Sequence, residues 1–204
     1  MKYNGILFSI ILLASFLTGS LASNRISFVC QANTCSYLLQ FVLLLFVFIV
    51  SIEVGSKLDI SRLNEIFTKM WSLVSSTIVG SLIAGVVFSL LFSYSIKLSL
   101  AISLGMGWYS FDAPTVEAYS GSMAGSLAFF ANFFREFLTI ALYPVASKLI
   151  GKTRPIIFGG ATTMDTSLTV IKTIGDTDTI AVAFMHGAFL TLIVPLLVPA
   201  LLSI

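Results

Sequence analysis

The sequence predicts an all-α integral membrane protein with about five spanning helices plus two short broken or re-entrant helical hairpins. Its composition is the first observation behind this prediction. The 204-residue chain is 57% hydrophobic and only 10% charged, with a mean hydropathy of +1.03. Soluble domains carry about 25% charged residues. Lipid must therefore be the solvent for most of this protein's surface.

Long apolar runs are the second observation, because a spanning helix needs about 20 mostly apolar residues. Four runs meet that length plainly and a fifth contains charged residues near its middle: 3–22, 37–54, 70–92 and 179–203, then 121–149. Helices are expected because every backbone group must be satisfied within its own segment. Residues 3–22 resemble a cleavable signal peptide as well, but we interpret them as a retained first span.

Loop charges predict the orientation, because Lys and Arg concentrate on the cytoplasmic side of a membrane. Two connections between spans carry three basic residues each: Lys57, Arg62 and Lys69, then Lys148, Lys152 and Arg154. The connection at 23–36 contains only Arg25. The chain is therefore expected in the cell (cytoplasmic or inner) membrane as a multi-pass protein with a cytoplasmic N-terminus.

Two further pieces are too short or too glycine-rich to be simple spans. Residues 97–107 offer about ten weakly apolar positions, and residues 155–174 contain the Gly159-Gly160 pair. Two oppositely directed re-entrant hairpins would preserve the orientation of the neighbouring spans. A short helix that crosses at 155–174 is the alternative, and it would move the C-terminus to the cytoplasm.

Paired, glycine-interrupted short segments are the sequence signal for a transporter's binding site. Irregular backbone at membrane depth is tolerated only inside protein or beside a water-filled cavity. We therefore divide the chain into a three-helix membrane unit, residues 1–95, and a transport core, residues 96–204. The irregular segments of the core are expected at 97–120 and 155–178.

Ionisable side chains at membrane depth are candidate functional residues, because each costs at least about 2.5–3.5 kcal/mol in hydrocarbon. Glu136 is the clearest case, since it lies near the middle of 121–149. Asn132 lies four residues earlier on the same helix face, and Arg135 points roughly 100° away. We expect Glu136 to lie in a transport pathway. The alternative is a buried structural pair between Arg135 and Glu136.

The second irregular segment contains Asp165 among hydroxyl-bearing residues. The hydroxyls of Thr162 and Thr163, with unwound carbonyls, could replace a substrate's lost hydration. Alternatively, these hydroxyls only satisfy backbone groups freed by the glycines. Asp165 is expected to share the pathway with Glu136.

Three more residues are candidates with open alternatives. Asp112 could lie at an outer vestibule that attracts cations, or simply face water. Tyr109 could gate the first hairpin or belong to an interfacial aromatic belt. His186, the single histidine, could relay protons near neutral pH or be a hydrogen-bonded structural residue.

Other function classes find no support in the sequence. It contains no phosphate-binding glycine loop, no His-Glu-x-x-His pair and no nucleophile elbow, so we expect no enzyme and no cofactor. Cys30 and Cys35 have no nearby His to complete a zinc site, and a disulfide or two free thiols remain open. An intramembrane dyad of Asp112 and Asp165 is disfavoured, because neither lies in a long clean helix. The net charge of +2 suggests no nucleic-acid partner.

Four motifs, in order along the chain, resemble those of the LysO-type lysine exporter family. They are Gly105-Met106-Gly107-Trp108-Tyr109-Ser110, Phe129-Phe130-Ala131-Asn132 with Arg135-Glu136, Gly160-Ala161-Thr162-Thr163-Met164-Asp165, and His186-Gly187. The resemblance implies a secondary transporter that exports L-lysine and cationic analogues from the cytoplasm, with Glu136 as a key acid. Proton antiport is the expected coupling.

The resemblance also suggests a partner. The family's usual chain begins with about three additional helices that carry a second acidic residue. We therefore expect this chain to act as a homo-oligomer or with a separate short membrane subunit, and Glu53 could partly replace the missing acid. Two other functions stay open: a sodium-coupled organic-anion carrier of similar broken-helix architecture, and a non-transporting membrane subunit.

Overall fold

The computed structural model describes residues 60–203 continuously, together with isolated positions between residues 18 and 56. The chain divides into two compact units, Met1–Val50 and Ser51–Ile204, and the description below concerns the second. Several predicted features lie outside the described residues: the spans at 3–22 and 37–54, the side of the N-terminus, Cys30, Cys35 and Glu53.

Every regular element in the described part of the chain is helical, and three helices are long and apolar enough to cross a membrane. They are α3 (Leu63–Phe92), α6 (Ser122–Ile150) and α9 (Thr177–Ser203). Their outward faces carry many exposed large apolar side chains, which suit contact with lipid. The prediction of an all-α membrane protein is confirmed.

The first long helix begins earlier than the apolar run predicts. A short 3₁₀ turn, Ile60–Arg62, leads directly into α3 at Leu63. Glu65 and Lys69 form an ion pair of 2.7 Å at i,i+4, which supports a polar helical turn ahead of the apolar stretch. Hydrophobicity alone therefore places the start of α3 too late.

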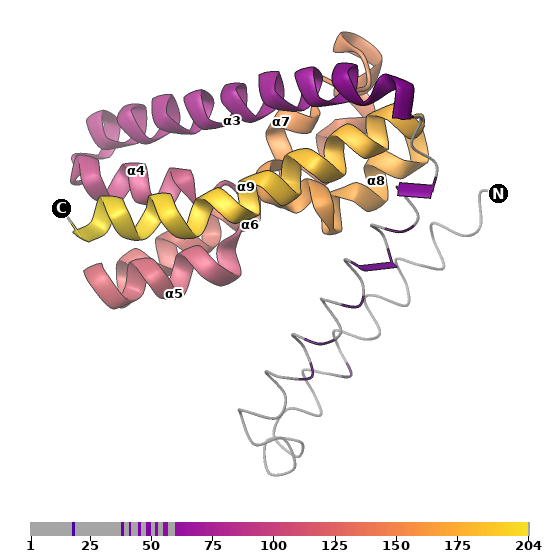
Figure 1. Ribbon diagram of the computed structural model, residues 1–204. Helices are drawn as coiled ribbons and strands as arrows, with labels where there is room; N and C mark the ends of the chain where they lie inside the picture. Colours follow the sequence, from indigo (N-terminus) through magenta and orange to yellow (C-terminus); the bar gives the residue numbers. More distant parts are fainter. Residues whose placement is uncertain are drawn as a thin grey trace. The chain divides into compact units, whose positions relative to one another are not determined.

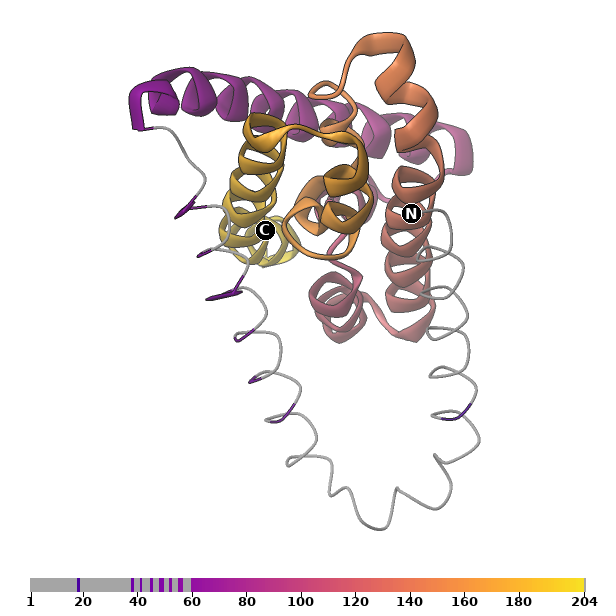
Figure 2. The same cartoon turned by 90° about the vertical axis from the view of Figure 1, so that its right-hand side faces the viewer.

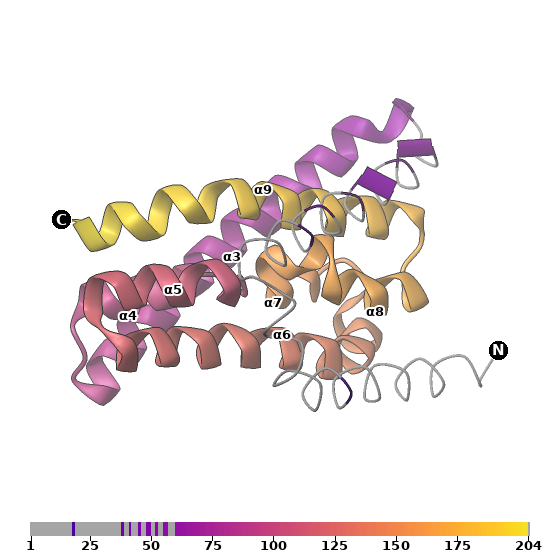
Figure 3. The ribbon, with the colours of Figure 1, turned by 90° about the horizontal axis from the view of Figure 1, so that it is seen from below.

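Two pairs of short helices turn back inside the bundle. The first pair is α4 (Ile96–Leu104) and α5 (Tyr109–Ser120), and the second is α7 (Ile156–Gly159) and α8 (Thr166–Ile174), joined by the 3₁₀ turn η2 (Gly160–Met164). Figures 1 and 3 show α4 and α5 at the end where α3 finishes, and α8 at the opposite end, where α9 begins. The two hairpins thus enter from opposite ends, as predicted, and residues 155–174 do not form a single crossing helix.

The tips of the two hairpins meet in the middle of the bundle. The amide of Ala161 donates a hydrogen bond of 2.9 Å to the carbonyl of Met106. Gly160 has a φ of +62°, and a Cβ atom there would overlap the Met106 carbonyl. Gly107 has a φ of +94°, and a Cβ atom there would lie 2.9 Å from the Gly159 carbonyl oxygen. The glycines of both motifs are required by this close crossing.

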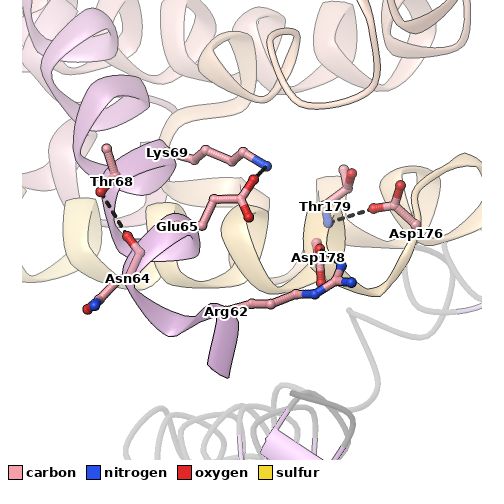
Figure 4. A network of polar contacts seen from close by, with 8 residues as sticks. All are labelled: Arg62, Asn64, Glu65, Thr68, Lys69, Asp176, Asp178 and Thr179. Atoms are coloured by element: carbon pink, nitrogen blue, oxygen red, sulfur yellow. Dashed lines mark hydrogen bonds and ion pairs between the residues drawn. The ribbon is translucent and has the colours of Figure 1, made fainter. Parts of the chain in front are cut away.

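The long helices pack around the crossing and are tied at one end. In Figure 3, α3 passes diagonally behind α9, and Figure 2 shows α8 and α9 side by side. At the start of α9, the Arg62 guanidinium lies 3.1 Å from the Asp178 carboxylate (Figure 4). Asp176 accepts a hydrogen bond of 2.9 Å from the Thr179 amide and so caps α9.

Candidate functional site

Asn132 of α6 holds the tip of the first hairpin. Its Oδ1 accepts a hydrogen bond of 2.7 Å from the Gly107 amide. Its Nδ2 donates to the Ile102 carbonyl at 3.1 Å and to the Asp112 carboxylate at 2.7 Å. Asn132 is buried, so its amide fixes the unwound backbone between α4 and α5.

Asp112 lies beneath this tip, and its side chain is 0% exposed. Neither the outer vestibule nor the water-facing position proposed from the sequence is correct. The reason is the packing of α5 on α6, which buries the face that carries Asp112 and Val116 at i,i+4. The Oδ1 atom of Asp112 has no hydrogen-bond partner among the described residues. A Cβ atom on Gly105 would overlap the carboxylate, so that glycine makes room for it.

Three of the predicted pathway residues come together on the other side of α6. The Glu136 carboxyl lies within interaction range of the Thr166 side chain and of the Asp165 carboxylate. Tyr109, at the start of α5, lies within electrostatic range of both acids. We call Tyr109, Glu136, Asp165 and Thr166 the acidic cluster.

Two helix starts position the acidic cluster: the start of α5 carries Tyr109, and the start of α8 carries Asp165 and Thr166. Asp165 immediately precedes α8, and its Oδ1 accepts a hydrogen bond of 2.6 Å from the Thr166 amide. Helix N-termini carry partial positive charge and favour carboxylates. Glu136 is 9% exposed and Asp165 is half-buried, so the cluster remains partly accessible. The sequence did not single out Thr166, although its position directly after Asp165 is the signal of a capped helix start.

Arg135 points away from this cluster and holds the second hairpin. Its Nε donates to the Phe158 carbonyl at 2.8 Å, and its two terminal nitrogens donate to the Ile157 carbonyl at 3.3 Å and to Ser81 Oγ at 2.9 Å. No carboxylate forms an ion pair with Arg135 within residues 60–203. The alternative, a structural ion pair between Arg135 and Glu136, is therefore wrong.

His186 joins three elements at the crossing. It is 0% exposed, with Nε2 at 2.9 Å from Thr77 Oγ1 of α3 and Nδ1 at 3.0 Å from Thr163 Oγ1 of η2. A neutral ring protonated at Nδ1 satisfies both contacts, because Thr77 can donate to Nε2 while Thr163 donates onward to a carbonyl. Gly187 lets α9 approach, since a Cβ atom there would overlap the Met164 amide. The proposed proton relay stays a prediction, and the contacts shown are structural.

The threonines of η2 bond to the backbone that the glycines free. Thr162 Oγ1 donates to the Gly159 carbonyl at 3.0 Å, and Thr163 Oγ1 lies 2.9 Å from the Gly160 carbonyl. Thr162 Oγ1 also lies 2.7 Å from Ser167 Oγ. Both hydroxyls are buried and partnered. A role for them in contacting substrate stays a prediction.

A cavity of about 600 Å³ lies on the Arg135 side of α6, between α3, α4, α6 and α7. Its polar wall consists of Arg135, Asn132 and several hydroxyls: Ser76, Thr77, Ser81, Ser99, Ser103 and Thr139. Within the described part of the chain, no group of three His, Cys, Asp or Glu side chains is placed to hold a metal ion. The site thus has two faces, an acidic one and a cationic one.

Comparisons with known proteins agree on one family. The family model for lysine exporter LysO matches residues 10–202. The lysine exporter LysO of Escherichia coli (strain K12) is 32% identical over 163 residues, which are 78% of this chain and 53% of that protein. A putative lysine exporter of Haemophilus influenzae is 33% identical over 159 residues, 77% of this chain and 80% of that protein. The chain thus spans about half the length of the first relative. No solved structure matches.

Proposed function

The chain belongs to the lysine exporter LysO family, a family of transporters and not of enzymes, and on this premise we propose that it exports L-lysine from the cytoplasm. The observation that supports this function best is the acidic cluster. Two carboxylates, Glu136 and Asp165, lie close together at the crossing of two broken helices. Such crossings are where secondary transporters bind substrate. An ammonium group of lysine is a suitable counter-ion for the two acids.

Proton antiport is the proposed coupling. Lysine carries a net positive charge, and moving one charge out of a cell that is negative inside costs about 2.3 kcal/mol per 100 mV. Exchange for an incoming proton offsets that cost. A carboxylate that binds either the ammonium group or a proton provides the coupling, because the two cations compete for the same oxygens. The same chemistry extends to cationic analogues of lysine.

The test is lysine transport by the purified protein in proteoliposomes under an imposed pH gradient. Glu136→Gln removes the charge but keeps the size of the side chain. Loss of a charge-assisted contact should lower transport by about 10- to 100-fold. Glu117→Gln is the matched control, because Glu117 is exposed on α5. Equal transport by the two variants would contradict the proposal.

Asp165→Asn separates charge from structure at the second acid. Asn caps a helix about as well as Asp, so α8 should keep its start. Transport should nevertheless fall, because the ammonium group loses half of its counter-charge. A sodium gradient with a dicarboxylate in place of lysine tests the second candidate function, an organic-anion carrier. The one observation that favours that candidate is that Arg135 forms no ion pair with a carboxylate among the described residues.

The assembly and the membrane orientation are also proposals. We place the chain in the cytoplasmic membrane with its N-terminus inside, acting as a homo-oligomer or with a separate short membrane subunit. The partly accessible acidic cluster supports a partner, because the exposed polar side chain of Thr166 is better satisfied by protein than by lipid. Native mass spectrometry of the purified complex would identify the partner, and labelling of single introduced cysteines would fix the sides.

A further inference from the structure

Arg135 donates three hydrogen bonds, but not all of its N–H groups have an acceptor among the described residues. A guanidinium has five N–H groups, and those of Arg135 donate to the carbonyls of Ile157 and Phe158 and to Ser81. Two N–H groups therefore have no acceptor among the described residues, one on each terminal nitrogen. None of the three bonds goes to a charged acceptor. A cation at membrane depth without a counter-ion is costly, so an anion on the remaining donors would stabilise it.

Ser99 supplies a second unused donor in the same cavity. It lies in the first turn of α4, its side chain is 2% exposed, and its Oγ has no hydrogen-bond partner among the described residues. Ser99 and Arg135 both line the cavity. Buried polar groups in native proteins are rarely unsatisfied, and the exceptions often bind a ligand.

Most of the other hydroxyls nearby are already engaged. Ser76 donates to the Ser72 carbonyl, Ser103 to the Leu100 carbonyl and Thr139 to the Arg135 carbonyl. Thr77 lies against His186. Ser81 accepts from Arg135, and its own O–H has no acceptor among the described residues. The donors that remain in the cavity, counted over these residues, are thus two guanidinium N–H groups and the hydroxyls of Ser99 and Ser81. A guanidinium and hydroxyls are donor types suited to an anion with two acceptor oxygens, such as a carboxylate.

We infer that the cavity between α3, α4, α6 and α7 binds the α-carboxylate of the amino-acid substrate through Arg135 and Ser99. Its volume of about 600 Å³ falls within the roughly 300–1,000 Å³ of small-molecule sites. The inference rests on the proposed function and adds which chemical groups of the substrate the protein recognises. The acidic cluster selects the ammonium group, and the Arg135 cavity selects molecules that also carry a carboxylate. One molecule need not contact both places at once.

The test compares L-lysine with two analogues that lack the carboxylate, L-lysinamide and cadaverine. In proteoliposomes, wild-type protein should transport lysine with a KM about tenfold or more below that of either analogue. Ser99→Ala should raise the KM for lysine about tenfold and leave lysinamide unchanged. Ser147→Ala is the matched control outside the cavity, because this buried hydroxyl of α6 already bonds to the Pro144 carbonyl. It should leave both substrates unchanged.

A second measurement, of melting temperatures, tests the carboxylate site without a transport assay. It also shows whether each variant is still folded. Ser99→Ala removes a hydroxyl that has no partner among the described residues, so the melting temperature without ligand should not fall. Arg135→Lys is less suitable, because it also disturbs the second hairpin. Lysine should raise the melting temperature of the wild-type protein in detergent more than cadaverine does, and Ser99→Ala should abolish the difference.

The outcomes are distinguishable. If wild-type protein transports lysine but treats lysinamide and cadaverine equally well, the carboxylate site is wrong and the export function stands. If Ser99→Ala and Ser147→Ala behave alike in KM and in stabilisation by lysine, the inference is likewise overturned. If lysine is not transported at all, the proposed function fails. Binding that still distinguishes lysine from cadaverine would then support the carboxylate site alone.

Discussion

Arg135 and Glu136 are neighbours in α6, yet the two regions that they face are built in opposite ways. On the Glu136 side, α5 and α8 begin, and two acids lie close together. On the Arg135 side, α4 and α7 end, and the guanidinium donates to the last carbonyls of α7. The Arg135 guanidinium and the Asp165 carboxylate thus each lie where a helix end stabilises the charge.

This difference shows how adjacent residues of opposite charge can lie in one helix at membrane depth without forming an ion pair. An Arg–Glu pair would neutralise both groups and leave neither for a ligand. Because the neighbours diverge around the helix, Arg135 reaches carbonyls of α7 while Glu136 lies beside the start of α8. Both regions depend on the crossing of the two hairpin tips, so disturbing the crossing should affect both.

The largest effect is expected from Gly160→Val, which breaks both regions at once. The substitution places a β-branched residue at a φ of +62° and against the Met106 carbonyl. It should cost more than about 3 kcal/mol of stability. Thermal unfolding in detergent would measure it. Gly80→Ala in α3 is the control, since no atom of the described residues lies within 4 Å of an added Cβ atom there. Equal melting temperatures would refute the close crossing.

Arg135→Gln and Glu136→Gln should separate the two regions. Arg135→Gln leaves carbonyls of α7 without their charged donor and should cost about 2–3 kcal/mol. Glu136→Gln breaks no hydrogen bond among the described residues and relieves repulsion from Asp165, so it should not lower stability. The melting temperatures of both variants in detergent provide the comparison. A greater loss of stability in Glu136→Gln would mean that the two sides are assigned the wrong roles.

His186→Ala tests whether the crossing itself transfers protons. The variant loses contacts to Thr77 and Thr163 and should cost about 1–3 kcal/mol. Its residual lysine transport should keep the wild-type pH profile, because both ring nitrogens are occupied by structural contacts. A shifted profile would restore the proton relay as the function of His186.

The smallest effect is expected from Asp176→Ala, far from both regions. Loss of this cap on α9 should cost about 1 kcal/mol and leave the KM for lysine unchanged. Hydrogen bonds from Thr179 lower the pKa of Asp176 below its usual value. The contribution of Asp176 to stability is therefore present above its unfolded-state pKa and is lost as the pH falls through its folded-state pKa. Asp176→Asn should keep the cap and remove this pH dependence.

Much of the architecture could be predicted from the sequence because hydrophobicity and glycine placement have direct structural causes. Three spans and two opposed hairpins follow from run lengths and from Gly107 and Gly160. Glu136 was identifiable because a carboxylate in an apolar helix is costly. The start of α3 was placed too late, since the Glu65–Lys69 pair extends the helix through a polar turn.

The positions of other site residues depend on tertiary packing, which one sequence does not reveal. Asp112 looks like a loop carboxylate beside Pro114, and only the packing of α5 on α6 buries it. Arg135 and Glu136 look like a pair, and only the second hairpin gives Arg135 its carbonyl partners. Ser99 carries no sequence signal at all, because an unsatisfied hydroxyl is recognised only from its surroundings.

Proton release on lysine binding tests the central claim most directly. Lysine is added to the purified wild-type protein in weak buffer, and the pH change is recorded across a range of starting pH values. If lysine and protons compete for the acidic cluster, wild-type protein and Glu117→Gln should release protons and Glu136→Gln should release far fewer. Lysine binding without proton release, or the same release from Glu136→Gln, would contradict the account.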